Sequence, residues 1–241
     1  MPMPHIERFA ALLLALALAG PAAASPYKIP DLSAATSVEI KLQAQYTKSL
    51  DGKRLEGPAL DMTAPLRPGL EGSVTVGFGK VSGMSWGVLD TELGLKWELL
   101  PIGDEDGHVG ITTAPSITLP TGTRGLGSND YQLTVPLIVG AHWGGLGLRG
   151  LIGVQRELRS DNNTLQLGAL AKYEVTKRFS VGVEVADEST LKFRDHNLSA
   201  DLGFTYSLTP AVELQGRVGH TLRVSGRPSA SEVAVFFEFA L

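Results

Sequence analysis

The chain has 241 residues, with 25 acidic and 21 basic side chains and a formal net charge of −4 at pH 7. This charge balance gives no reason to expect a nucleic-acid partner, and the absence of cysteine excludes disulfides and thiolate metal sites. The mean hydropathy of +0.08 does not exclude a membrane protein, because a β-barrel alternates lipid-facing and lumen-facing residues and averages near zero.

The first 25 residues have the order of a cleavable export signal. A short polar start is followed by the apolar run 9–19, which Gly20-Pro21 ends, and three alanines precede a cleavage site near Ser25. The apolar run is too short to anchor the chain in a bilayer. We therefore expect residues 1–25 to be a secretory signal peptide, with a retained N-terminal helix as the alternative, and residues 26–241 to be the mature protein.

Past the signal, apolar and polar residues alternate with a period of two, as in Val38, Ile40 and Leu42 against Glu39 and Lys41. Such alternation gives a strand one apolar and one polar face. It predicts twelve strands, near residues 38–47, 57–65, 70–79, 86–99, 108–119, 129–142, 145–157, 163–174, 179–187, 196–207, 211–223 and 231–241.

The length of these strands favours a membrane barrel over a soluble sandwich. Most have ten residues or more, whereas strands of soluble sheets have about five or six, and a tilted membrane strand needs about 9–11. The prediction is an all-β fold, a transmembrane antiparallel up-and-down β-barrel of about 12 strands. The strand at 57–65 is the least regular, because Pro58 and Pro65 flank it.

The connections and the aromatic residues predict how the barrel is oriented. Aromatic side chains gather near both ends of the strands, as expected for the two headgroup layers. We expect short turns on the periplasmic side at 66–69, 144–145, 175–178 and 208–210, and longer outer links at 48–54, 120–128, 188–195 and 224–230. Within these predicted strands, the apolar face is almost free of ionisable groups, and the exceptions are Arg156, Asp187 and His220, all at outer strand ends.

The polar face predicts a charged lumen. Its lining candidates are Glu39, Lys41, Glu92, Lys96, Glu98, Arg149, Lys172, Glu184, Asp201, Glu213 and Arg217. Further acids on the same face, such as Asp61, Asp90 and Glu238, make acidic residues the majority. Two interpretations stay open: an acidic, cation-tolerant path, or a network of ion pairs that props the barrel open or fills it. Residues 25–37 are interpreted as too short to fill the lumen.

No catalytic, metal or cofactor site is predicted. His220 has neither a serine nor an acid beside it in its own strand, and His108 and His196 lack metal-ligand spacing to a partner. The glycine-rich stretch 122–127 is similar to part of a phosphate loop, but it precedes a strand and therefore lacks the helix N-terminus that would bind phosphate.

Three segments carry a family resemblance: Gly83 to Trp97, which ends in Gly-Leu-Lys-Trp; Ser116 to Gly127, with Leu-Pro-Thr-Gly followed by Gly-Leu-Gly; and Asp130 to Ser160. Together they resemble the outer-membrane barrels named for the meta-pathway of phenol degradation, a "transporter" family, over roughly residues 38–241. The predicted mouth loop comprises Pro120, Thr121, Gly122, Arg124, Gly125 and Gly127, and two interpretations of it stay open: a gate that folds over the mouth, or an ordinary surface loop.

The resemblance implies a porin-like protein of the Gram-negative outer membrane, exported through the periplasm, in contact with outer-membrane lipid and inserted by the barrel-assembly machinery. It implies passive passage of small solutes, aromatic or other hydrophobic compounds among them, with no cofactor and no catalytic residue. A closed barrel with a structural or surface-binding role is the alternative, and an outer-membrane enzyme is the third hypothesis. Assembly signals usually end in an aromatic residue, whereas this chain ends in Leu241.

Overall fold

The computed structural model describes residues 26–49, 52–103, 106–128, 130–160, 162–191, 195–224 and 229–241, so the expected signal peptide at 1–25 lies outside the described residues. The described elements are β-strands. They are β1 (Glu39–Ser49), β2 (Gly52–Arg67), β3 (Leu70–Val81), β4 (Gly87–Val88), β5 (Thr91–Leu100), β6 (Val109–Thr113), β7 (Ser116–Leu119), β8 (Gln132–Trp143), β9 (Leu146–Glu157), β10 (Asn163–Thr176), β11 (Phe179–Thr190), β12 (Asn197–Thr209), β13 (Val212–Val224) and β14 (Ala230–Ala240). No helix among the described residues is long and apolar enough to cross a membrane.

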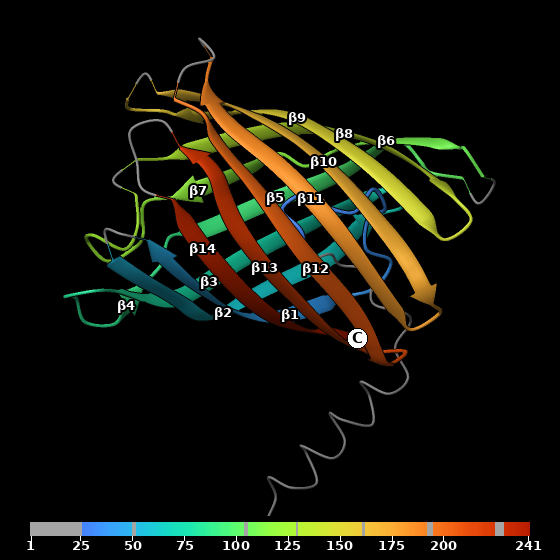
Figure 1. Cartoon of the computed structure of the whole chain (residues 1–241), viewed down its shortest axis with the longest axis horizontal. Helices are drawn as coiled ribbons and strands as arrows, with labels where there is room; N and C mark the ends of the chain where they lie inside the picture. The colour runs from blue at the N-terminus through green and yellow to red at the C-terminus, as the bar shows by residue number, and fades with distance from the viewer. Residues whose placement is uncertain are drawn as a thin grey trace, which may run out of the picture.

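The strands form one closed antiparallel barrel, which Figure 1 shows from the side. Strands pair in the order of the chain, with β4 and β5 both paired to β3, and β6 and β7 both paired to β5 and β8. β1 pairs with β14 from Glu39↔Ala240 to Ser49↔Ala230, which closes the ring. β4 and β5 are two parts of one predicted strand, and β6 and β7 are two parts of another, so the wall has the twelve antiparallel strands that the sequence predicts.

Two predicted strands are interrupted because proline or a short turn breaks the ladder. Between β6 and β7, Ala114-Pro115 leaves the pairing, since proline has no N–H to donate. The carbonyl of Pro115 still accepts a hydrogen bond from the N–H of Leu95 at 2.9 Å, so the wall stays continuous there. Leu89 and Asp90 separate β4 from β5, and the N–H of Leu89 still donates to the carbonyl of Gly77 on β3 at 2.8 Å.

The prediction for the second strand and the link before it was wrong in its bounds. β2 starts at Gly52 and ends at Arg67, so it contains both prolines, and most of the expected outer link 48–54 is strand. The register shifts between Glu56 and Ala59 and again between Pro65 and Arg67. The first shift leaves Pro58 unpaired, whereas Pro65 stays opposite Glu71 and lies beyond Thr63, where the pairing of β2 with β1 ends, so the strand continues past both prolines.

The two ends of the barrel differ in their connections. Two-residue turns, Pro68-Gly69, Gly144-Gly145, Lys177-Arg178 and Pro210-Ala211, lie at one end, here called the turn end. The long segment from Pro120 to Tyr131 lies at the opposite end, here called the loop end. The turn end is the one that the sequence assigns to the periplasm.

The side chains sort as the alternation predicts. Outward residues on β1 and β14 are exposed and apolar, for example Leu42 and Phe237, which face each other across the pair at 43% and 42% exposure. Inward residues are polar and buried, including Glu238 and Gln215. The molecule is therefore apolar outside and charged inside, which is the inverse of a soluble protein.

The interior is not empty. Residues 26–37, here called the N-terminal segment, lie inside the ring of strands (blue in Figure 1), and the interpretation that they are too short to fill the lumen was wrong. Tyr27, Ile29 and Leu32 are buried in a cluster with Ile138 of β8 and Leu170 of β10. The prediction failed because the segment needs to cross the lumen only once in order to divide it.

Candidate functional site: an occupied lumen

The N-terminal segment divides the interior into two spaces. An outer cavity of about 460 Å³ lies toward the loop end, and its lining includes Asp61, Glu92 and Gln132. An inner cavity of about 410 Å³ lies toward the turn end and is lined by residues such as His142 and Lys172. Asp31 and Ser33 line both cavities, so the segment is the partition between them.

Inward-facing glycines make room for the apolar side chains of the segment. A Cβ added at Gly203 would lie 2.6 Å from the ring of Tyr27, and one added at Gly182 would lie 2.5 Å from its hydroxyl oxygen. A Cβ at Gly168 would lie 2.9 Å from Ile29 Cδ1. Real side chains do not approach so closely, so these wall positions accept the segment because they carry no side chain.

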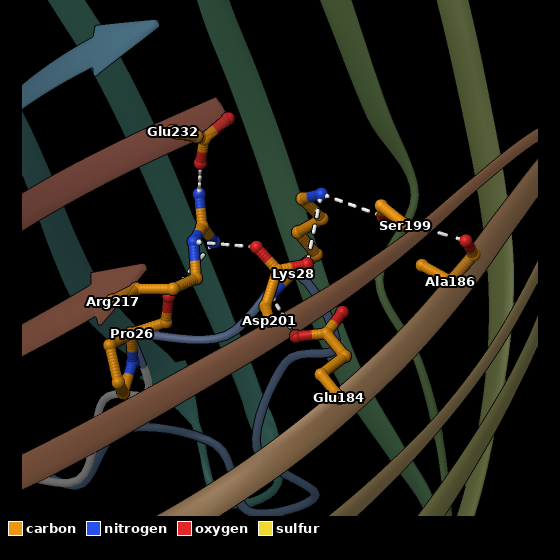
Figure 2. Close-up of polar contacts among 8 residues, drawn as sticks. All are labelled: Pro26, Lys28, Glu184, Ala186, Ser199, Asp201, Arg217 and Glu232. Carbon is orange, nitrogen blue, oxygen red and sulfur yellow. Dashed lines mark hydrogen bonds and ion pairs between the residues drawn. The ribbon is translucent and has the colours of Figure 1, made fainter. Parts of the chain in front are cut away.

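Lys28 fixes the start of the segment to β11 and β12. Its Nζ lies 3.2 Å from Asp201 Oδ2 and donates to the hydroxyl of Ser199 at 3.1 Å, and its backbone N–H donates to Glu184 Oε2 at 2.8 Å (Figure 2). Glu184 and Asp201 are 0% and 3% exposed, so these carboxylates would be costly without partners.

Arg217 of β13 completes this cluster. It donates to the backbone carbonyl of Pro26 at 2.9 Å, pairs with Glu232 through Nη2, and lies 3.6 Å from Asp201 Oδ1 through Nε (Figure 2). The guanidinium thus joins the wall to the first described residue of the segment. Three of the predicted lining residues, Glu184, Asp201 and Arg217, are therefore brought together by a segment that the sequence argument left outside the lumen.

A second set of contacts holds the middle and end of the segment. Arg149 pairs with Asp31 and donates to the carbonyl of Pro30 at 3.4 Å. Lys96 Nζ donates to the carbonyl of Ser33 at 3.0 Å. The N–H of Ala34 donates to Glu98, and the N–H of Ala35 donates to Glu71. Lys96 and Glu71 also pair with each other at 3.0 Å, which links this set to the wall.

The charge of Asp31 depends on these neighbours. Burial acts to raise the pKa of this carboxyl group, but the Arg149 guanidinium, with Lys172 and Lys96 farther away, outweighs burial and holds the pKa below its ordinary value. The ionised form is therefore the one that the folded lumen favours.

The other lining candidates lie on the cavity walls. Lys41 pairs with the buried Glu238 at 3.5 Å, and Gln215 donates to both Glu238 and Glu213. Glu39, Lys41 and Glu92 line the outer cavity, whereas Lys172 and Glu213 line the inner one. The outer cavity has six acids and three bases in its lining: Asp31, Glu39, Asp61, Glu71, Glu92 and Glu238 against Lys28, Lys41 and Lys96.

The loop at the mouth is organised by Asp90. Its carboxylate accepts the N–H of Gly122 at 2.7 Å and the N–H of Ser128 at 2.5 Å, and so binds both ends of the glycine-rich stretch. Arg54 of β2 donates to the carbonyl of Leu126 at 3.0 Å, and Leu126 itself is buried. Between this loop and the wall is a cavity of about 540 Å³, here called the vestibule, which Arg54, Asp90 and Glu92 line with other residues.

The mouth-loop residues are placed differently from one another. Gly125, Gly127 and Leu126 line the vestibule. Thr121 accepts the N–H of Thr91 at 2.9 Å and holds the loop to β5. Pro120 follows the end of β7, and Arg124 forms an isolated bridge with Gly127. Gly125 has a φ of +86°, a left-handed conformation that favours glycine.

The histidines gain partners that single-strand reasoning could not supply. His220 Nδ1 lies 3.0 Å from the hydroxyl of Ser231 on β14, and His196 Nδ1 lies 2.8 Å from Asp187. On the next strands, Ala200 is opposite His220 and Lys48 is opposite Ser231. Neither residue supplies the carboxylate of a catalytic triad. Among the described residues, no group of three or more His, Asp or Glu side chains is placed to hold a metal ion.

Sequence reasoning missed Tyr27, Lys28, Asp31, Glu71 and the structural role of Asp90. The sequence did contain a signal for this contact. Tyr27 and Ile29 have large side chains, and the inward-facing Gly168, Gly182 and Gly203 have none, so the glycines leave the space that the large side chains occupy. It could not be recognised without knowing which strand positions face one another across the lumen.

A family model described as "Putative MetA-pathway of phenol degradation" matches residues 29–239. None of the curated proteins searched is detectably similar in sequence.

Solved structures share the fold at low sequence identity. An outer-membrane channel of Pseudomonas putida F1 is 15% identical with a TM-score of 0.66, and the alignment covers 90% of this chain and 99% of that one. The NanC porin is 11% identical with a TM-score of 0.62, covering 84% and 100%. The KdgM porin is 14% identical with a TM-score of 0.58, covering 83% and 99%. These similarities confirm the barrel fold.

Proposed function

Because the chain belongs to the family described as "Putative MetA-pathway of phenol degradation", we propose that it is a bacterial outer-membrane channel that passes small solutes passively, aromatic or other hydrophobic compounds among them. The single observation that carries the proposal is the pair of cavities on either side of the N-terminal segment. A barrel whose only role was structural would not need solvent-sized spaces that lead toward both ends.

The lining of the outer cavity supports a preference among solutes. With six acids against three bases, the potential there favours cations and neutral molecules over anions. The cavity also has apolar surface. Pro30 and Ala35 of the segment and Leu95 and Leu151 of the wall contribute to it. A small aromatic compound with a neutral or cationic substituent fits both features.

The N-terminal segment gives the channel a gate. It crosses the lumen between the two cavities with buried side chains, and we infer that continuous passage requires the segment to move or leave. It is held by a limited set of hydrogen bonds and ion pairs, with Lys28, Asp31 and the backbone from Pro26 to Ala35 on its side. The closed state is therefore a bound state whose lifetime depends on these contacts.

The alternative is a closed barrel without transport. The hydrogen bonds and ion pairs of the N-terminal segment would produce such a barrel if they never break. The similar solved structures are channels and porins and not enzymes, which gives the coarse class. We extend this to the absence of catalysis, since His220 and Ser231 lack a third member on the neighbouring register positions.

Planar-bilayer conductance and liposome swelling test the proposal. The mature protein is compared with a variant that lacks residues 26–35, using a sugar, a phenolic compound, and salts with a large cation or a large anion. We expect small or brief currents from the intact protein, and larger, cation-preferring currents with faster swelling from the shortened one. Absence of current and of solute flux from both forms, each folded by heat-modifiability on gels, would remove the channel and leave the closed barrel.

A further inference from the structure

A row of basic side chains surrounds part of the outer wall at the loop end. Lys48 of β1, Lys53 of β2 and Lys80 of β3 are exposed, and each shares a face with an outward apolar or aromatic residue two positions away: Tyr46, Leu55 and Phe78. These side chains therefore point away from the lumen, toward the medium that surrounds the barrel. The three lysines are here called the lysine row.

Register places these residues side by side. Lys48 is directly opposite Lys53 in the β1–β2 pair. Lys80 is opposite Leu55 in the β2–β3 pair, which makes it the diagonal neighbour of Lys53. Side chains directly opposite one another have Cβ atoms about 5 Å apart, and diagonal neighbours lie about 7–8 Å apart. Three ammonium groups thus converge on one patch of the wall.

No acidic side chain among the described residues pairs with this patch. Like charges directly opposite each other in a sheet are unfavourable. Among the described residues, none of the three lysines forms an ion pair, whereas the lumen lysines Lys28, Lys41 and Lys96 all do. The repulsion between Lys48 and Lys53 would be relieved by an anion between them.

The position of the lysine row along the wall indicates which anion. On β13, β14, β1 and β2, the register row immediately below Lys48 and Lys53 on the same face is Val218, Val233, Tyr46 and Leu55, all exposed and apolar, and this row continues to Lys80 on β3. Continuing the lysine row across β14 and β13 gives Ser231 and His220, which are hydrogen-bonded to each other. Lys48, Lys53 and these polar groups thus begin one side-chain step, about 7 Å along the strand, above the apolar residues, and Lys80 is level with Leu55. We interpret that step as the boundary between acyl chains and headgroups.

We propose that the lysine row is a binding site for the phosphate group of a phosphorylated lipid headgroup in the leaflet at the loop end. Lys48 and Lys53 bind the phosphate from both sides, Lys80 adds a third positive charge, and Tyr46, Leu55 and Val233 contact the acyl chains of the same lipid. This inference depends on the membrane location of the barrel but not on transport, so either can fail without the other.

Lipid binding to the purified mature protein in detergent, followed by native mass spectrometry, tests the site. The probes are bis-phosphorylated lipid A, its dephosphorylated form, and inorganic phosphate as competitor. We expect the phosphorylated lipid to bind at least about tenfold more tightly than the dephosphorylated one, and this preference to weaken in high salt.

The double variant Lys48→Gln/Lys53→Gln is expected to lose that preference. Its matched control is Lys177→Gln/Arg178→Gln, which removes two exposed positive charges from a turn at the opposite end and should bind as the parent does. Equal binding of the two lipids by the parent protein, or an unchanged preference in the Lys48/Lys53 variant, would overturn the proposal. Displacement of the lipid by low-millimolar inorganic phosphate would instead identify a site for the free anion and would overturn the assignment to a headgroup.

Discussion

The Nζ of Lys28 lies 3.2 Å from Oδ2 of Asp201, a carboxylate of β12 that is 3% exposed. Lys28 belongs to the N-terminal segment and Asp201 to the barrel wall, so this ion pair exists only while the segment occupies the lumen. Asp201 also faces Arg217 at 3.6 Å, so it keeps one cation when the segment leaves. The closed state is therefore stabilised by Lys28 without the open state being left with an isolated buried charge.

Replacing Lys28 by Gln should weaken the hold on the segment while leaving the barrel folded. The lysine side chain is 40% exposed, so the loss is expected to be about 1 kcal/mol, below that of a fully buried pair. The expected result is a severalfold higher open probability in planar bilayers. Lys177→Gln, in a turn, is the control that should leave the currents unchanged. Identical currents from the Lys28 variant and the parent would show that this pair does not hold the gate.

A disulfide should lock the segment in place. The ideal Cβ of residue 168 lies 3.2 Å from Ile29 Cγ1, close to the separation of a Cβ from the partner sulfur in a disulfide. The chain has no native cysteine, so Ile29→Cys/Gly168→Cys introduces only these two thiols. We expect oxidation to abolish single-channel openings and reduction to restore them. Both single-cysteine variants serve as controls, and openings that persist in the oxidised, cross-linked protein would contradict a moving segment.

A side chain at Gly203 should displace the segment from the inside. Its Cβ would lie 2.6 Å from the Tyr27 ring, so Gly203→Val is expected to expel Tyr27 and to produce a larger, longer-lived current. Gly147→Ala is a matched change at another wall glycine, where the nearest atom, the carbonyl oxygen of Lys172, is 3.8 Å from the added Cβ. If both variants conduct as the parent does, Tyr27 is not part of the obstruction.

Removing the Asp90 carboxylate should loosen the mouth loop. Asp90→Ala leaves the N–H groups of Gly122 and Ser128 without their acceptor, at a local cost of about 1–3 kcal/mol. Trypsin should then cut faster after Arg124, which is exposed in the same loop. The cleavage rate of Asp90→Asn, which retains one acceptor oxygen, should lie between the rates of the parent and of Asp90→Ala. Equal cleavage rates in all three proteins would exclude Asp90 as the organising group.

Acid should release the segment through Asp31. Because the folded-state pKa of Asp31 lies below its ordinary value of 3.8, its stabilisation is complete above that pH and is lost as the pH falls through the lower folded-state value. The difference in open probability between the parent and Asp31→Asn should therefore be largest near neutral pH and should shrink below about pH 4. A difference that stays constant down to pH 3 would contradict the role of this carboxylate.

The wall of the barrel was predictable from the sequence, whereas its contents were not. Alternation such as Leu42, Ala44 and Tyr46 depends only on residues within one strand, and it gave both the twelve strands and the inward face of Glu184 or Arg217. The pairing of Lys28 with Asp201 joins residues far apart in sequence, and local periodicity carries no information on that contact. The prolines of β2 misled for a related reason, since a bulge that accommodates them is decided by the neighbouring strand.

The seam where the ring closes has a consequence for how long any opening lasts. The N–H of Leu241 donates to the carbonyl of Val38 at 2.8 Å, so the segment is anchored to the wall immediately after its last residue. A released segment therefore remains attached, at an effective concentration of the order of millimolar, as expected for a short flexible linker. Return to the lumen is then a first-order step that is independent of protein concentration, and openings should end spontaneously in a single isolated molecule.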